Sequence, residues 1–127
     1  MFNRTVLVCF CVFGLTTACN IIVRITNQSS EPYFVEIKTP SGQKSPLLAL
    51  NSMGTQATYN FNEQICSSPT SIKVYQKNGN NVGALISSSS AVLDGMGSID
   101  YLIFPGGSIN VGARIGVTCA LGGCKQG

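Results

Sequence analysis

The sequence predicts an all-β protein, a small antiparallel β-sandwich or partly open barrel of seven to eight strands stapled by disulfides. Apolar residues recur at every second position through most of the chain, which is the period of a half-buried strand. Clusters of Gly, Pro, Asn and Ser interrupt these runs at intervals that suit short strands. No segment shows helical periodicity over the length that a helix needs.

The alternating runs and the turn residues between them define the expected strands. Residues "NGNN" and "PGG" each separate two such runs, and both predict hairpins because Asn and Gly tolerate a positive φ. The run "YLIF" is apolar on both faces, which indicates a central strand. The expected strands cover residues 21–26, 33–38, 46–50, 55–61, 70–77, 82–87, 98–104 and 108–119.

The last expected strand has the longest alternation in the chain. One set of its side chains is predicted to be buried: Ile109, Val111, Ala113, Ile115, Val117 and Cys119. On the opposite face, Gly112 and Gly116 indicate bulges or a bend. The functional alternative is that they leave a flat strip for another backbone or a sugar.

The first eighteen residues have the three parts of a secretory signal peptide: a positive charge at Arg4, an apolar run of about ten residues, and small residues before the cleavage site. The apolar run is too short to span a bilayer. We therefore expect residues 1–18 to be removed and residues 19–127 to form one secreted, extracellular domain. In an alternative, Cys19 becomes an acylated first residue that anchors the same fold to a membrane.

Four cysteines remain after this cleavage, and an even number in a secreted domain predicts two disulfides. If the first and last strands are antiparallel neighbours, Cys19 pairs with Cys119 and Cys66 with Cys124. The rival pairing joins Cys119 to Cys124. A thiolate metal site is less consistent with the spacing and with an oxidising compartment, so we expect neither a metal nor a cofactor.

The composition narrows the chemistry. The chain has no His, which excludes Ser-His-Asp and Cys-His nucleophile systems. Its net charge of +3 is scattered, so we expect no nucleic-acid partner. Asp94 and Asp100 bracket "DGMGSID", and a hydrolase using them is an alternative. We favour a Gly-rich turn for this segment, and hence a protein without enzymatic activity.

Two further sites are expected on the surface. Asn27 begins the triplet Asn-Gln-Ser and is a candidate glycosylation site. Strand parity places Lys73, Tyr75 and Lys77 outside on 70–77, and Phe34 outside on 33–38. An exposed Tyr between two cations suits a sugar or an acidic partner. The sequence thus predicts a secreted protein that binds an extracellular glycan or protein surface.

Overall fold

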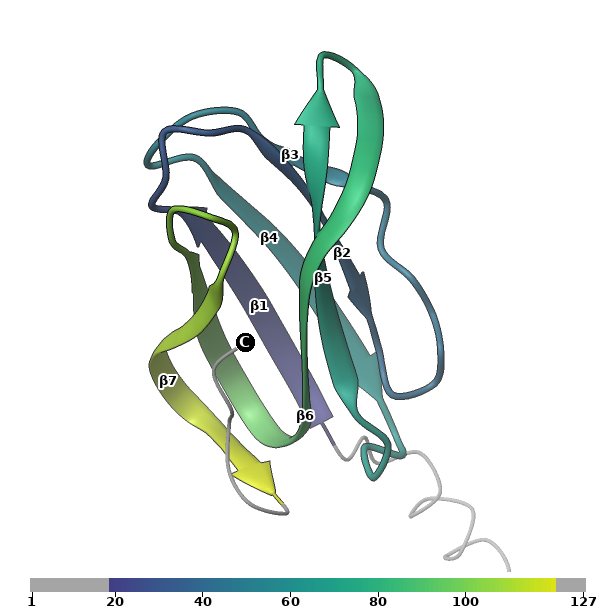
Figure 1. The fold of residues 1–127 in the computed structure, drawn as a ribbon. Coiled ribbons are helices and arrows are strands. Elements are labelled where there is room, and N and C mark those ends of the chain that lie inside the picture. The colour runs from purple at the N-terminus through teal and green to yellow at the C-terminus, as the bar shows by residue number, and fades with distance from the viewer. Residues whose placement is uncertain (1–18, 121–127) are drawn as a thin grey trace, which may run out of the picture.

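The computed structural model describes residues 19–120, and it confirms the all-β fold. Strands make up 69% of this part of the chain, which contains no helix and therefore no candidate membrane-spanning helix. The predicted signal peptide and Cys124 lie outside the described residues. The seven strands are β1 (Cys19–Asn27), β2 (Tyr33–Lys38), β3 (Leu48–Leu50), β4 (Gln56–Glu63), β5 (Thr70–Asn78), β6 (Asn81–Ile103) and β7 (Ile109–Ala120) (Figure 1).

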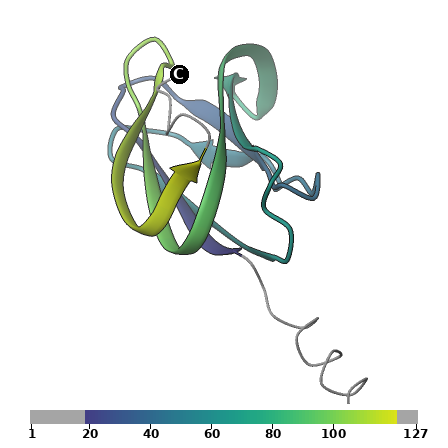
Figure 2. The same ribbon diagram turned by 90° about the horizontal axis from the view of Figure 1, so that it is seen from below.

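The strands form two layers that share β6. The layer that we call sheet B contains β3, β2, β5 and residues 81–91 of β6, in that order. The layer that we call sheet A contains β4, β1, residues 92–103 of β6, and β7. All neighbours are antiparallel except β1 and β6, which run parallel. The strands curl around one interior, so the sandwich is a nearly closed barrel (Figure 2).

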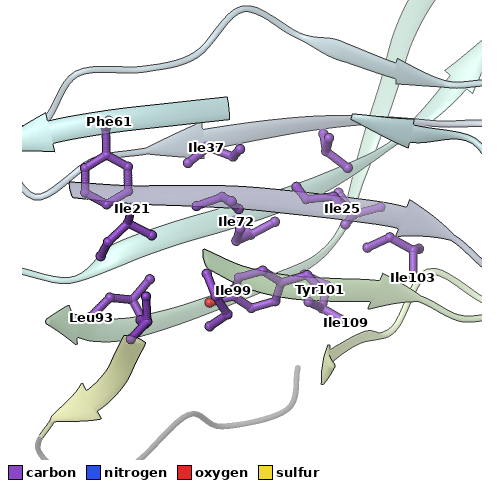
Figure 3. Close-up of a cluster of buried hydrophobic side chains, with 14 of the residues drawn as sticks. Ile21, Ile25, Ile37, Phe61, Ile72, Leu93, Ile99, Tyr101, Ile103 and Ile109 are labelled. Atoms are coloured by element: carbon purple, nitrogen blue, oxygen red, sulfur yellow. The ribbon is translucent and has the colours of Figure 1, made fainter. Parts of the chain in front are cut away.

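The core lies between the layers and follows the period-two pattern. On β1, Ile21, Val23 and Ile25 are fully buried, whereas Ile22 is exposed. Their burial removes apolar surface from water and supplies the main favourable term for folding. Figure 3 shows side chains from both layers pointing toward one another; the buried set includes Ile37 on β2, Phe61 on β4, Ile72 on β5, Leu93, Ile99, Tyr101 and Ile103 on β6, and Ile109 on β7.

The two expected strands 82–87 and 98–104 are parts of the single long strand β6. The predicted turn at "DGMGSID" is therefore wrong, because residues 94–100 pair with β1 on one side and β7 on the other. Backbone N–H and C=O groups of this segment pair with β1 and β7, so they do not form the local hydrogen bonds of a turn. The predicted hairpins at "NGNN" and "PGG" are confirmed, and the "YLIF" segment is central as expected.

Two bulges interrupt the pairing of β6 with β7. One places Met96 and Gly97 opposite Gly116, and the other places Gly112 and Ala113 opposite Asp100, so the bulges expected at Gly112 and Gly116 are confirmed. A Cβ atom on Gly97 or Gly116 would overlap a backbone oxygen of the facing strand, and both glycines have positive φ. Glycine is therefore required where these backbones approach.

The bulges also change which side chains of β7 are buried. Ile109 and Val117 are buried as predicted, but Ala113 is exposed and Ile115 is 68% exposed. The prediction for these two residues is wrong because each bulge adds one residue to one strand, which breaks the strict alternation between faces.

The structure contains a disulfide between Cys19 and Cys66, whose Cα atoms are 6.3 Å apart. The favoured pairs, Cys19 with Cys119 and Cys66 with Cys124, are therefore wrong. They assumed that the first and last strands are neighbours, but β6 lies between β1 and β7. Cys119 is also disulfide-bonded. Its rival pairing with Cys124 stays a prediction, since Cys124 lies outside the described residues.

Replacing Cys19 and Cys66 together by Ser is expected to lower the free energy of unfolding by about 4 kcal/mol, because the bond closes a loop with a sequence separation of 47. Urea denaturation of the double variant measures the loss. Peptide mapping without reduction is the control, and a peptide that links Cys19 to Cys119 would contradict the structure.

Tyr101 lies in the core, and its burial raises the pKa of its phenol to about 12. Because the folded pKa exceeds the ordinary value of 10, the fold favours the neutral form. This stability is complete below pH 10 and is lost as the pH rises toward 12. We expect the free energy of unfolding to fall by about 1 kcal/mol more in wild type than in Tyr101→Phe between pH 9 and pH 11. Equal losses in the two proteins, measured by denaturant titration, would show that Tyr101 is not the group responsible.

Candidate functional site

The four residues predicted to form a binding site lie together on the outer face of sheet B. Strands β2 and β5 are antiparallel neighbours, and Phe34 is directly opposite Tyr75 in their register. Lys73 and Lys77 share the outward parity of Tyr75, with Lys73 opposite Glu36. Each of these side chains is partly exposed, while Tyr33, Val35 and Ile37 of β2 and Thr70, Ile72 and Val74 of β5 are buried. Toward the hairpin, Gln76 and Asn78 are exposed as well.

A row of apolar side chains crosses the four strands of sheet B at the level of Tyr75. In the order of the strands it consists of Ala49 on β3, Phe34 on β2, Tyr75 on β5 and Leu85 on β6. Directly opposite residues of neighbouring strands lie close enough for their side chains to make contact. We call these four residues the aromatic row.

Sequence reasoning missed the contribution of β6 to this face. Leu85 is 52% exposed and lies opposite Tyr75, and Val82 is 48% exposed and lies opposite Lys77. The register between β5 and β6 shifts on both sides of Tyr75, so parity along β6 does not predict which of its residues face outward. The only available signal was the hairpin at "NGNN", which places the start of β6 beside the end of β5.

Lys77 is held at the hairpin end of this face. Its Nζ donates a hydrogen bond to the backbone oxygen of Gly79 at 2.7 Å and lies 5.3 Å from the centre of the Phe34 ring. A cation at this distance is attracted by the negative face of the ring. The hairpin of β5 and β6 extends beyond the rest of the sandwich (Figure 1), so the row lies at its base.

Two more lysines lie at the other end of the same face. Lys38 follows Phe34 and Glu36 along the outward side of β2, and an isolated antiparallel bridge pairs it with Lys44. Both lysines are exposed. The outer face of sheet B therefore has the aromatic row near the hairpin and a basic end formed by Lys38 and Lys44.

The side chain of Asn27 is fully buried at the end of β1. Its Nδ2 donates to the backbone oxygens of Glu31 at 2.8 Å and Leu50 at 3.2 Å, and its Oδ1 accepts from the backbone N–H of Ser29 at 2.8 Å. A glycan attached to Nδ2 would replace one of its two hydrogens, so at least one of these hydrogen bonds would be lost. These hydrogen bonds give Asn27 a structural role in the turn after β1, and we expect the predicted site to be unmodified in the folded protein.

Replacing Asn27 by Ala is expected to reduce the free energy of unfolding by about 3 kcal/mol, since three hydrogen bonds lose their partner. Gln28→Ala is the control, because this exposed neighbour should change stability by less than about 0.5 kcal/mol. Intact mass of the folded wild-type protein should show no glycan. A glycan at Asn27, or equal stability of the two variants, would contradict this structural role.

Asp94 and Asp100, the alternative catalytic pair, do not face each other. They lie six positions apart on β6, a distance of about 20 Å along an extended strand. Asp100 accepts a hydrogen bond from Nε of Arg24 at 2.8 Å, and the same guanidinium donates to Ser98. Within residues 19–120, no group of His, Cys, Asp and Glu is arranged to hold a metal ion.

A polar contact between Glu63 and Ser41 joins the two layers near the disulfide. The carboxylate of Glu63 on β4 accepts hydrogen bonds from the backbone N–H and the hydroxyl of Ser41, at 2.9 and 2.7 Å. Burial raises the pKa of Glu63, but hydrogen bonds from Thr39 and Ser41 outweigh this effect and hold the pKa below its usual value. A shallow hollow beside this contact is lined by Pro40, Ser41, Glu63, Gln64 and Ile65.

The disulfide also bears on the lipid-anchor alternative. Anchoring would require the sulfur of Cys19 to carry a thioether-linked lipid. That sulfur is bonded to Cys66, and the Cys19 side chain is fully buried. The disulfide and the anchor are therefore mutually exclusive.

No family model and no curated protein matches the chain. Among solved structures, a likeness is found to the human-specific toxin intermedilysin, with 8% identity and a TM-score of 0.37 over 74% of this chain and 23% of that one. A structure described as a trapped toxin is similar over 73% of this chain and 23% of its own, with 7% identity and a TM-score of 0.36. The chain thus spans about a quarter of the length of these proteins.

Proposed function

We propose that the chain is a secreted, non-enzymatic protein that binds a glycan or a protein surface through the outer face of sheet B. The observation that carries this proposal is the aromatic row. Phe34, Tyr75 and Leu85 form a continuous apolar strip across neighbouring strands, and no second layer of the described residues covers it. Apolar groups gathered on a surface are typical of sites where a partner binds.

The composition of the row suits recognition rather than catalysis. Tyr75 combines a large apolar area with a polar hydroxyl, and such side chains are enriched at interfaces. The row is bordered by Lys73 on one side and by Lys77 on the other, so a polar rim surrounds an apolar centre. The carboxylates that a hydrolase would require are absent from the row itself.

The disulfide supports an extracellular location. The bond between Cys19 and Cys66 is typical of proteins that mature in an oxidising compartment. This agrees with the export that the N-terminal signal pattern predicts. Binding in the extracellular space is the function that these features favour together.

The test is a binding screen against an immobilised panel of glycans, with Leu85→Ser and Tyr75→Ala as the site variants. We expect each to weaken binding of a recognised glycan by at least about tenfold, as the loss of a central apolar contact does. Ile115→Ser is the matched control, because this residue is an equally apolar, 68% exposed side chain on sheet A. Thermal melts establish that all three variants are folded.

Unchanged binding in both site variants would discard the aromatic row as the binding site. An equal loss in Ile115→Ser would also contradict the proposal, because it would place the binding surface on sheet A or show a general effect of removing exposed apolar groups.

A further inference from the structure

Four of the six cations in residues 19–120 lie on one face. Strand parity and the bridge to Lys44 place four lysines on the outer side of sheet B. Strands β2 and β5 contain one carboxylate, Glu36. The seven cations that follow the predicted signal peptide are Arg24, Lys38, Lys44, Lys73, Lys77, Arg114 and Lys125.

The basic end of this face places like charges opposite one another. Lys38 and Lys44 are direct partners in an isolated antiparallel bridge, and both are exposed. Like charges at directly opposite positions destabilise a strand pair. An anion bound between the two ammonium groups would replace this repulsion with attraction, so the fold itself favours a negatively charged ligand here.

The lysines are spread along the strands instead of forming one compact cluster. Lys38 is opposite Ser71, and from Ser71 to Lys77 the outward side of β5 extends about 20 Å. Lys73 and Tyr75 lie between these ends, and Ser88 and Ser90 of β6 lie beside Lys73 and Ser71. Along β5, hydroxyl groups therefore alternate with cations: Ser71, Lys73, Tyr75 and Lys77.

We propose that this face binds an acidic polysaccharide, sulfated or carboxylated, which lies along β5 from Lys38 and Lys44 to Lys77. The lysines pair with the anionic groups of the chain, the serine hydroxyls hydrogen-bond its sugar hydroxyls, and Tyr75 packs against the apolar face of a sugar ring. This ligand class rests on the proposed function, because it uses the same outer face of sheet B.

The arrangement favours a polysaccharide over a membrane surface. A bilayer that met the projecting hairpin would contact Val82, Leu85 and Lys77. It would leave Lys38 and Lys44, at the far end of the same face, without an anionic partner. A linear polymer contacts both ends at once.

The direct test measures binding of the disulfide-bonded secreted protein to heparin by calorimetry at low and physiological salt. We expect saturable binding that weakens as salt rises, because salt screens interactions between exposed charges. Neutral dextran, a single-stranded DNA oligonucleotide and vesicles containing phosphatidylserine are the comparison probes. Binding of dextran as tight as that of heparin would overturn the role of charge, and equally tight binding of DNA or vesicles would overturn the assignment to a sugar polymer.

The variants Lys38→Gln and Lys44→Gln, combined, are expected to weaken heparin binding by about tenfold and to reduce its salt dependence. Arg114→Gln is the single-charge control on β7, to be compared with Lys38→Gln alone. Folding should be preserved, since the double variant removes a repulsion. Equal affinity of wild type and the double variant would overturn this inference.

The two proposals fail separately. Heparin binding that needs Lys38 and Lys44 but is unchanged in Tyr75→Ala and Leu85→Ser would support the acidic ligand on the lysines and discard both the aromatic row and the packing of Tyr75 against a sugar ring. Loss of glycan binding in those two variants, with heparin not bound at all, would support the row and overturn the acidic ligand.

Discussion

The continuity of β6 is the constraint on which the rest of the structure depends. Residues 81–91 of this strand pair with β5 in one layer, and residues 92–103 pair with β1 and β7 in the other. The two layers are therefore joined through a single strand, and the hydrophobic core lies between them. Because β1 pairs with a strand more than seventy residues away in sequence, the central pairing of the fold is long-range and entropically costly to form.

The glycines of β6 and β7 follow from this constraint. A strand that takes part in two layers has to bend and twist strongly, and bulges increase the local twist. At Gly97 and Gly116 the two backbones approach so closely that a Cβ atom would overlap a carbonyl oxygen. The same bulges leave Ile115 exposed on sheet A, so exposure of an apolar side chain there has a structural cause and does not by itself indicate a binding site.

The parts of the structure that the sequence predicted are those that depend on local pattern. Alternation predicted most of the strands but missed residues 88–97, which join two expected strands into β6, and the Asn- and Gly-rich turns predicted both hairpins. Parity predicted that Phe34 and Tyr75 each point outward from their strands, whereas their position opposite one another follows from the pairing of β2 with β5. The pairing of Cys19 depends on which strands are neighbours, and Leu85 depends on a bulge, so neither follows from local pattern.

The proposal that sheet B is the binding face rests on a difference between the two outer faces. On sheet A the cation Arg24 pairs with Asp100 and also donates to Ser98, and Arg114 on β7 donates to the backbone oxygen of Val117. On sheet B the bridge between Lys38 and Lys44 leaves two like charges facing each other. A chain that is poor in charged residues thus has two lysines facing each other on the face that also carries Tyr75. The facing lysines and the partly exposed ring of Tyr75 are the two groups that the proposed ligand would contact.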